Sequence, residues 1–203
     1  MTSSTLLKIN QTFTPEEKAI SMLNLKKRNI LSKDVREYLE QTLNDAHPLI
    51  RFAAARTLAR ALGENSPDKA LDVLLMGMEN HKEIRASYNP LPTTTYDVIH
   101  DACLSVCLAG KHKTSRVLPR LEAIIDSSTN FGATSIAFAI LYLLFEETDK
   151  IKSSQDLTHD QLNSLLLILE SKRAWVNNGN MAEMLERFGL PQTRNELKRW
   201  LHK

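Results

Sequence analysis

The sequence predicts an all-α protein of about ten helices, paired into about five consecutive hairpins as in an α-solenoid. Apolar residues recur at helical spacing and hardly ever alternate over the length of a strand. Helix-start signals recur along the chain, and pairing the helices they open gives a spacing of about 35 to 45 residues. We therefore expect one domain over residues 1–203, with a flexible N-terminus at 1–13 and a C-terminal capping unit at 175–203.

The first helices have clear start signals. Thr14 and Glu17 can form a capping box around Pro15, which suits the first turn of a helix. A second helix is expected from Ser32. A third is expected from Pro48, followed by its antiparallel partner.

The third helix has the composition of a repeat unit that cannot bury its apolar face alone. Asp45 can cap its first amide groups, Pro48 suits its first turn, and Gly63 can adopt the left-handed conformation that ends a helix. Its expected apolar stripe is Ile50, Ala53, Ala54, Leu58, Ala61 and Leu62. The alanines would let another helix approach closely. Three arginines would stay near solvent or pair with neighbours, namely Arg51, Arg56 and Arg60.

This unit resembles the HEAT-like repeat, in particular the short version named after the phycobilisome lyases. The pattern is an Asp, a Pro, an aliphatic residue followed by Arg, and two alanines before a Leu. It is carried by Asp45, Pro48, Ile50, Arg51, Ala54, Ala55 and Leu58. The resemblance covers one unit of about 35 residues and implies a helical solenoid. It also implies one alternative function, a lyase-type subunit that attaches or removes a bilin.

The remaining helices follow the same spacing. A polar insertion from His81 to Thr94 interrupts the array, and the apolar helix from Phe131 to Glu146 is expected in the middle of the core. The other expected helices begin at or near Ser66 and Pro67, Val98, Thr114 or Ser115, Thr158, Asn180 and Thr193.

Composition limits the classes of partner. The chain is 42% hydrophobic with a formal net charge of +2, so no global field attracts a polyanion or an anionic membrane. The first residues lack the apolar core of a signal peptide, and the longest apolar segment is too short to span a bilayer. Cys103 and Cys107 share a helical face, which suits packing better than a disulfide. We therefore expect a cytoplasmic protein without a membrane partner.

The strongest metal-binding candidate is a cluster of Asp97, His100, Asp101, Cys103 and Cys107. Ligands three or four residues apart could share one ion. The alternative, which we favour, has both cysteines packed as small apolar residues. No nucleophile motif or phosphate-binding loop is present in the sequence. We therefore expect no metal, cofactor or catalytic residue, and the sequence favours a binding role while leaving enzymatic activity open.

Basic residues suggest nucleic acid as an alternative partner. One group is Lys111, Lys113, Arg116 and Arg120, and a C-terminal group is Lys172, Arg173, Arg187, Arg194, Lys198, Arg199 and Lys203. Trp175 and Trp200 accompany the second group, and exposed aromatic rings can stack on bases. The spacing of Trp200 with Leu197 and Leu201 instead favours core packing. The chain is also similar to HEAT-like alkylpurine DNA glycosylases, but their motif residues do not align with any Trp and Asp here.

The leading hypothesis is an adaptor that binds a protein or peptide on the concave face of the solenoid. Residues expected to point into that face are Lys69, Asp72, Arg116, Arg120, Asn163, Arg194 and Lys198. Their mixed charge suits a polar protein better than a uniform polyanion. The insertion is a second candidate surface, with His81, Arg85 and Tyr88 as contacts.

Overall fold

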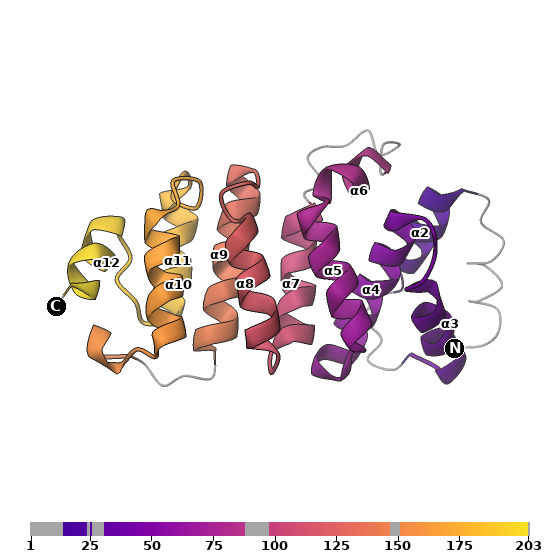
Figure 1. The fold of residues 1–203 in the computed structure, drawn as a ribbon, viewed down its shortest axis with the longest axis horizontal. Helices are drawn as coiled ribbons and strands as arrows, with labels where there is room; N and C mark the ends of the chain where they lie inside the picture. Colours follow the sequence, from indigo (N-terminus) through magenta and orange to yellow (C-terminus); the bar gives the residue numbers. More distant parts are fainter. Residues whose placement is uncertain (1–13, 24, 26–30, 88–97, 147–150, 203) are drawn as a thin grey trace. The chain divides into compact units, whose positions relative to one another are not determined.

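The computed structural model describes residues 14–23, 25, 31–87, 98–146 and 151–202. This part of the chain contains eleven α-helices, two short 3₁₀ helices and no strand, so the predicted all-α class is confirmed (Figure 1). Its helices are all too short or too polar to cross a lipid bilayer. The chain divides into two compact units, Met1–His112 and Lys113–Lys203, and each is described by itself. That the whole chain acts as one continuous domain stays a prediction.

The first unit is organised around one helix. Its helices are α2 (Pro15–Leu23), α3 (Lys33–Thr42), α4 (Pro48–Leu62), α5 (Asp68–Glu79), α6 (His81–Ser87) and α7 (Val98–Gly110). All five of the others pack against α4. Four alanines of α4 have no exposed surface, namely Ala53, Ala54, Ala55 and Ala59. Because these side chains are small, neighbouring backbones can approach α4 from several sides.

The apolar face of α4 differs in part from the predicted stripe. Ala61 and Leu62 are only partly buried, whereas the predicted Leu58 is fully buried. Thr57 is also buried, and its hydroxyl is satisfied there because Oγ1 donates a hydrogen bond of 3.0 Å to the carbonyl of Met22 in α2. The buried surface is therefore wider than a single stripe, which fits a helix with neighbours on several sides.

The ends of α4 differ in detail from both predicted caps. Gly63 ends the helix as predicted, with a φ of 56° that favours glycine, but its ψ of −131° is not that of the predicted left-handed helical conformation. The predicted cap Asp45 is not the N-cap, which is His47. Asp45 instead accepts a hydrogen bond of 2.9 Å from the His47 amide. Asp45 therefore shapes the turn before the helix rather than capping the helix itself.

The insertion from 81 to 94 was expected to lack a helix, and that expectation is wrong for its first part. Residues 81–87 form α6, whose Ile84 is buried. The helix packs against α4, α5 and α7. Tertiary packing therefore stabilises a short polar segment that has no apolar periodicity of its own. Residues 88–97 lie outside the described residues.

The second unit also has a central helix. Its helices are α8 (Thr114–Ile124), α9 (Asn130–Phe145), α10 (His159–Glu170), α11 (Asn178–Arg187) and α12 (Arg194–Leu201). α8, α10 and α11 pack against α9, and α12 packs against α10 (Figure 1). The first turns of α9 are capped by Thr129, whose Oγ1 accepts from the Gly132 amide at 2.9 Å. The predicted apolar helix is therefore the centre of this unit.

Polar contacts join the outer helices of the second unit. Ser164 of α10 donates a hydrogen bond of 2.7 Å to the carboxylate of Glu122 in α8. The Arg187 side chain of α11 lies beside α9, 3.2 Å from an oxygen of Glu146. Its guanidinium also lies 5.7–5.9 Å from the ring centroids of three aromatic residues, namely Phe138, Tyr142 and Phe188. A single cation thus contacts three rings and a carboxylate.

Candidate functional site

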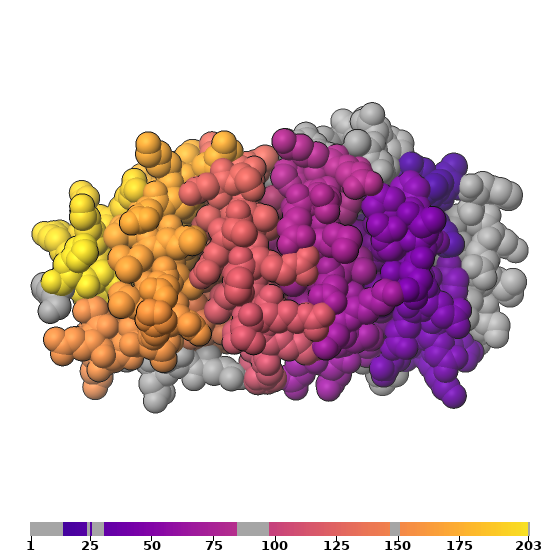
Figure 2. All heavy atoms as spheres, viewed as in Figure 1, coloured from indigo at the N-terminus to yellow at the C-terminus, as the bar shows by residue number. Residues whose placement is uncertain are grey.

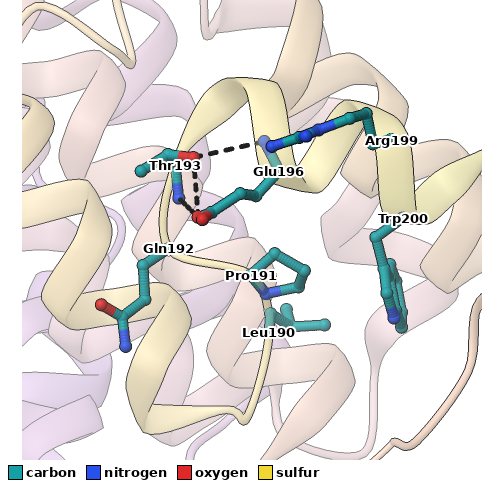
Figure 3. A pocket seen from close by; sticks show the side chains of 7 residues that line it. All are labelled: Leu190, Pro191, Gln192, Thr193, Glu196, Arg199 and Trp200. Carbon is teal, nitrogen blue, oxygen red and sulfur yellow. Dashed lines mark hydrogen bonds between the residues drawn. The ribbon is translucent and has the colours of Figure 1, made fainter.

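A pocket of about 720 Å³ lies where α11 is followed by α12 in the second unit. The residues that line it are Leu190, Pro191, Gln192, Thr193, Glu196, Arg199 and Trp200 (Figure 3). A pocket of this volume is in the range that binds small molecules or peptide side chains. Figure 2 shows α12, in yellow, at the surface of its unit.

A tight turn after α11 positions one wall of the pocket. Gly189 has a φ of 72°, which only glycine adopts readily. The amide of Leu190 donates a hydrogen bond of 2.9 Å to the carbonyl of Leu185, which closes the end of α11. Leu190 is buried, and Pro191 follows it partly exposed. The turn therefore anchors one apolar residue and presents another to the pocket.

A capping box fixes the other wall. The Glu196 amide donates to Thr193 Oγ1 at 3.2 Å, and Glu196 Oε2 accepts from the amide of Thr193 at 3.2 Å. The same oxygen accepts from the Thr193 hydroxyl at 2.7 Å (Figure 3). These bonds satisfy amide groups at the start of α12 and hold the Glu196 carboxylate with two donors. The carboxylate that lines the pocket is therefore fixed in position by its own helix and keeps its negative charge.

Trp200 and Arg199 complete the pocket from the C-terminal part of α12. Trp200 is partly exposed, whereas Leu197 on the same helix is fully buried. In Figure 3 the indole of Trp200 extends from α12 on one side of Pro191, and the side chain of Gln192 lies on the opposite side. The Trp200 position was predicted to serve core packing, and its side chain instead lines a solvent-accessible pocket.

The second tryptophan of the chain lies in the core. Trp175 is 6% exposed, and its indole nitrogen donates a hydrogen bond of 2.9 Å to the carbonyl of Ile168. Its polar group is therefore satisfied inside the protein. Of the two tryptophans that accompany the C-terminal basic residues, only Trp200 is placed to contact a ligand.

The cations of α12 have different roles. Arg194 donates hydrogen bonds of 2.8 and 3.3 Å to the carbonyls of Leu169 and Glu170, at the end of α10. It therefore holds α12 against α10. Lys198 and Arg199 are exposed, and within the described part of the chain neither pairs with a carboxylate. Nε of Arg199 donates a hydrogen bond of 3.4 Å to the carbonyl of Asn195, one turn earlier in α12.

The structure distributes the predicted binding residues over both units. Lys69, Asp72, His81 and Arg85 belong to the first unit, while Arg116, Arg120, Asn163, Arg194 and Lys198 belong to the second. The side chain of Arg85 and all of Tyr88 lie outside the described residues. Arg194 and Lys198 share α12 with three pocket residues. That the whole set contacts one partner stays a prediction.

Several predicted contact residues have partners inside the protein. Lys69 donates a hydrogen bond to the Oδ1 of Asn44. Nδ1 of His81 lies 3.1 Å from the carbonyl of Met78, near the end of α5. The amide of Asn163 lies 2.9 Å from Nε2 of His159, one turn earlier in α10. The contacts of His81 and Asn163 are local, whereas that of Lys69 reaches a residue 25 positions earlier in the chain.

The residues that were considered as a metal-binding cluster have other contacts in the structure. Asp101 forms ion pairs with Arg56 and Arg60 of α4, the second at 2.8 Å. Cys103 and Cys107 are buried and form no disulfide. Asp97 lies outside the described residues, and among those described no three His, Cys, Asp or Glu side chains are grouped as ligands. Asp101 therefore joins α7 to α4, and two of the three α4 arginines pair as predicted.

Comparison with known proteins adds no assignment. The chain matches no protein-family model, no curated protein and no solved structure. The resemblance to HEAT-like repeats therefore rests on the residues of one repeat unit, and the function must be argued from the site.

Sequence reasoning named Arg199 and Trp200 but not the rest of the pocket. Pro191, Thr193 and Glu196 were interpreted only as signals that end one helix and begin the next. Two sequence features could have indicated the pocket: a helix end close to the next helix start, and a tryptophan one or two turns later. They do not show whether the tryptophan faces the core or the turn.

Proposed function

We propose that this protein is a non-catalytic helical adaptor that binds a protein or peptide partner, with the C-terminal pocket as one contact site. The observation that supports this function is the composition of the pocket. Leu190, Pro191 and Trp200 offer apolar surface, while the polar lining residues are exposed at its rim. Interface hot spots are enriched in Trp and Arg, and they combine an apolar centre with a polar rim.

We also propose that the helices belong to a HEAT-like solenoid. The buried alanines of α4 and its packing partner α5 support this architecture, because close helix pairs are the unit of such arrays. Under this proposal Arg116 and Arg120 are further partner contacts. They lie four residues apart on α8 and so share one side of that helix. The proposed place of action is the cytoplasm.

The function can be tested by affinity capture from the native host with three forms of the full chain. These are the wild type, Trp200→Ala, and the double charge reversal of Arg116 and Arg120 to Glu. Lys33→Ala is the control, because Lys33 is exposed on α3 of the other unit and belongs to neither candidate surface. Each extract is divided into nuclease-treated and untreated halves.

A polypeptide that survives nuclease, is retained by the Lys33 control and is lost with Trp200→Ala would support the adaptor function at the pocket. If the polypeptide is lost only with the double charge reversal, the contact site lies on α8 and not at the pocket. Polypeptides captured equally by all four forms would argue against both surfaces. Thermal unfolding of each variant must match the wild type for these comparisons to hold.

Nucleic acid is the second candidate partner, because Trp200 lies beside Arg199 on the surface of α12. An exposed ring can stack on a base while a neighbouring cation contacts phosphate. Under this alternative, capture would disappear with nuclease, and affinity for a single-stranded oligonucleotide would fall steeply as salt is raised. Salt-insensitive or absent binding would exclude it.

A further inference from the structure

The start of α11 carries the one Asn–Gly pair of the sequence, Asn178–Gly179, and both residues are exposed. Asn177 is the N-cap of this helix, and its side chain accepts a hydrogen bond of 3.3 Å from the Asn180 amide. Among the described residues, the Asn178 carboxamide and the Gly179 amide have no hydrogen-bond partner. A side-chain carbonyl carbon and an amide nitrogen that the fold does not occupy are therefore neighbours in the chain.

These two groups can react with each other. The Gly179 amide nitrogen loses its proton and attacks Cγ of Asn178, and the bond from Cγ to Nδ2 breaks with release of ammonia. The product is a succinimide ring. Water then adds to one of the two ring carbonyl carbons and opens the ring, which leaves either aspartate or isoaspartate at position 178. The balance is one water consumed and one ammonia released, and no other reactant is needed.

The surroundings of Gly179 favour ring closure. Glycine has no Cβ that would hinder the approach of its nitrogen to the preceding side chain. A Cβ added to Gly179 would meet only the Asn177 side chain, at 3.6 Å, so the space around the reacting groups is open. Ring closure also requires the backbone of Asn178 to leave the helical conformation. The reacting pair occupies the first two positions of α11, and helix ends open at little cost in free energy.

A second asparagine has the same kind of small neighbour but a protected one. Asn65 is followed by Ser66, whose amide donates a hydrogen bond of 3.0 Å to the carbonyl of Gly63. Ser66 is also buried. The nitrogen that would attack the Asn65 side chain is therefore already bound inside the protein, whereas the nitrogen of Gly179 is not.

We propose that Asn178 is a site of spontaneous deamidation in the folded protein, which converts it through a succinimide to aspartate and isoaspartate. The two products differ in their effect on α11. Aspartate leaves the backbone unchanged and places a carboxylate in the first turn, where the helix dipole favours it. Isoaspartate directs the main chain through the side chain and so inserts one methylene group into the backbone. This inference is independent of the proposed adaptor function.

The inserted methylene group would lie inside both hydrogen bonds that begin α11. One is the bond from the Asn180 amide to the Asn177 side chain, and the other is a backbone bond of 3.2 Å from the Met181 amide to the Asn177 carbonyl. Met181 has no exposed surface. Isoaspartate should therefore unwind the first turn of α11 and disturb the packing of Met181, whereas aspartate should do neither.

The test is incubation of the full-length protein at physiological temperature over a series of neutral to mildly alkaline pH values, both folded and in urea. Trypsin then releases residues 174–187, which contain Asn177, Asn178 and Asn180 in one peptide. Mass spectrometry with electron-transfer fragmentation assigns aspartate and isoaspartate to each position. Asn65 is followed as the protected reference. Gly179→Ala and Asn178→Ser are incubated in parallel.

In the folded protein, product should accumulate at position 178 several-fold faster than at 177, 180 or 65, and faster as the pH rises. In urea, Asn65 should react as well, because its protecting bond is lost. Gly179→Ala should slow the reaction at 178 several-fold, because a Cβ then hinders ring closure, and Asn178→Ser should abolish it. Aged wild type should unfold at a lower urea concentration than aged Asn178→Ser, whereas fresh Asn178→Asp should match the unaged wild type.

Three outcomes would count against this inference. Reaction at 178 that is no faster than at 177 and 180 in the folded protein would overturn the site. Reaction at 178 only in urea would show that the fold protects this pair, and would overturn it equally. If aged wild type is as stable as aged Asn178→Ser, the modification site stands but its effect on α11 is wrong. None of these measurements depends on partner capture, so the adaptor function is tested separately.

Discussion

Replacing Gly77 with alanine should destabilise the first unit, although alanine is the better helix former. A Cβ at this position of α5 would lie 2.7 Å from Cδ2 of Phe52 and 2.9 Å from Cδ1 of Ile84. Carbon atoms pack best at about 3.5–4.0 Å, so these contacts are too short by roughly 0.6–1.3 Å. Phe52 has no exposed surface and Ile84 is 3% exposed, so neither side chain can move into solvent.

The magnitude follows from two opposed effects. Alanine in a helix interior gains about 1 kcal/mol over glycine. Overpacking a dense core costs about 1–3 kcal/mol, and the buried Phe52 ring places this site in the upper part of that range. The expected net loss for Gly77→Ala is therefore about 1–2 kcal/mol in the free energy of unfolding. Urea denaturation followed by circular dichroism would measure it.

A second helical glycine provides the matched control. A Cβ at Gly179 in α11 would meet only the Asn177 side chain, at 3.6 Å, which is an ordinary contact. Gly179→Ala should therefore be neutral or slightly stabilising. Combining Gly77→Ala with Ile84→Val removes one clashing methyl group, so the double variant should be more stable than the sum of the single losses predicts. A Gly77→Ala protein as stable as the wild type would refute the close approach of α4, α5 and α6.

Two further predictions concern buried or shielded cations. Asp101→Ala should lower the free energy of unfolding by about 3 kcal/mol, because it leaves Arg56 and Arg60 without their shared carboxylate. When Arg56→Ala is added to Asp101→Ala, it should lower the free energy of unfolding by less than it does in the wild type, as measured by urea denaturation. Strict additivity of the two losses would contradict the pairing. Arg187→Ala should cost about 1–2 kcal/mol through its three ring contacts and the Glu146 pair. Arg187→Lys should restore only part of this, because the planar guanidinium is lost, and full restoration would argue against ring stacking.

Local signals explain why most helices could be predicted. The capping boxes at Thr14, Thr158 and Thr193 are present as expected, each with the acid or amide three residues later. Such caps depend on residues within one turn, so the sequence contains all the information they need. Gly63 similarly ends α4 through its own backbone conformation. These elements owe little to distant parts of the chain.

Features that depend on tertiary packing were missed or misplaced. The helix α6 has one buried apolar residue, Ile84, and forms because α4, α5 and α7 surround it. Nothing in its own seven residues indicates an amphipathic helix. Asp45 had the right chemistry for an N-cap but lies two residues before the actual cap, His47. Short segments and cap positions are thus decided by neighbours that periodicity does not reveal.

The pocket was missed for a related reason. Trp200 lies at helical spacing with Leu197 and Leu201, which predicts that all three face a core. α12 packs against α10, and within α12 only Leu197 is buried. A helix with few neighbours has a narrow buried face, so apolar residues at its edge become surface. The number of neighbours that a helix has therefore changes what the same spacing means.

Charge is the property that composition describes least well here. A net charge of +2 spread over 203 residues gives no reason to expect an anionic partner. Around the pocket, however, one acid and one base meet, because Glu196 and Arg199 both line it. The capping box fixes the position of the Glu196 carboxylate, and a bond from Nε to the Asn195 carbonyl holds the Arg199 side chain along α12. A ligand at this pocket therefore meets two opposite charges, and their placement depends on hydrogen bonds that no count of residues contains.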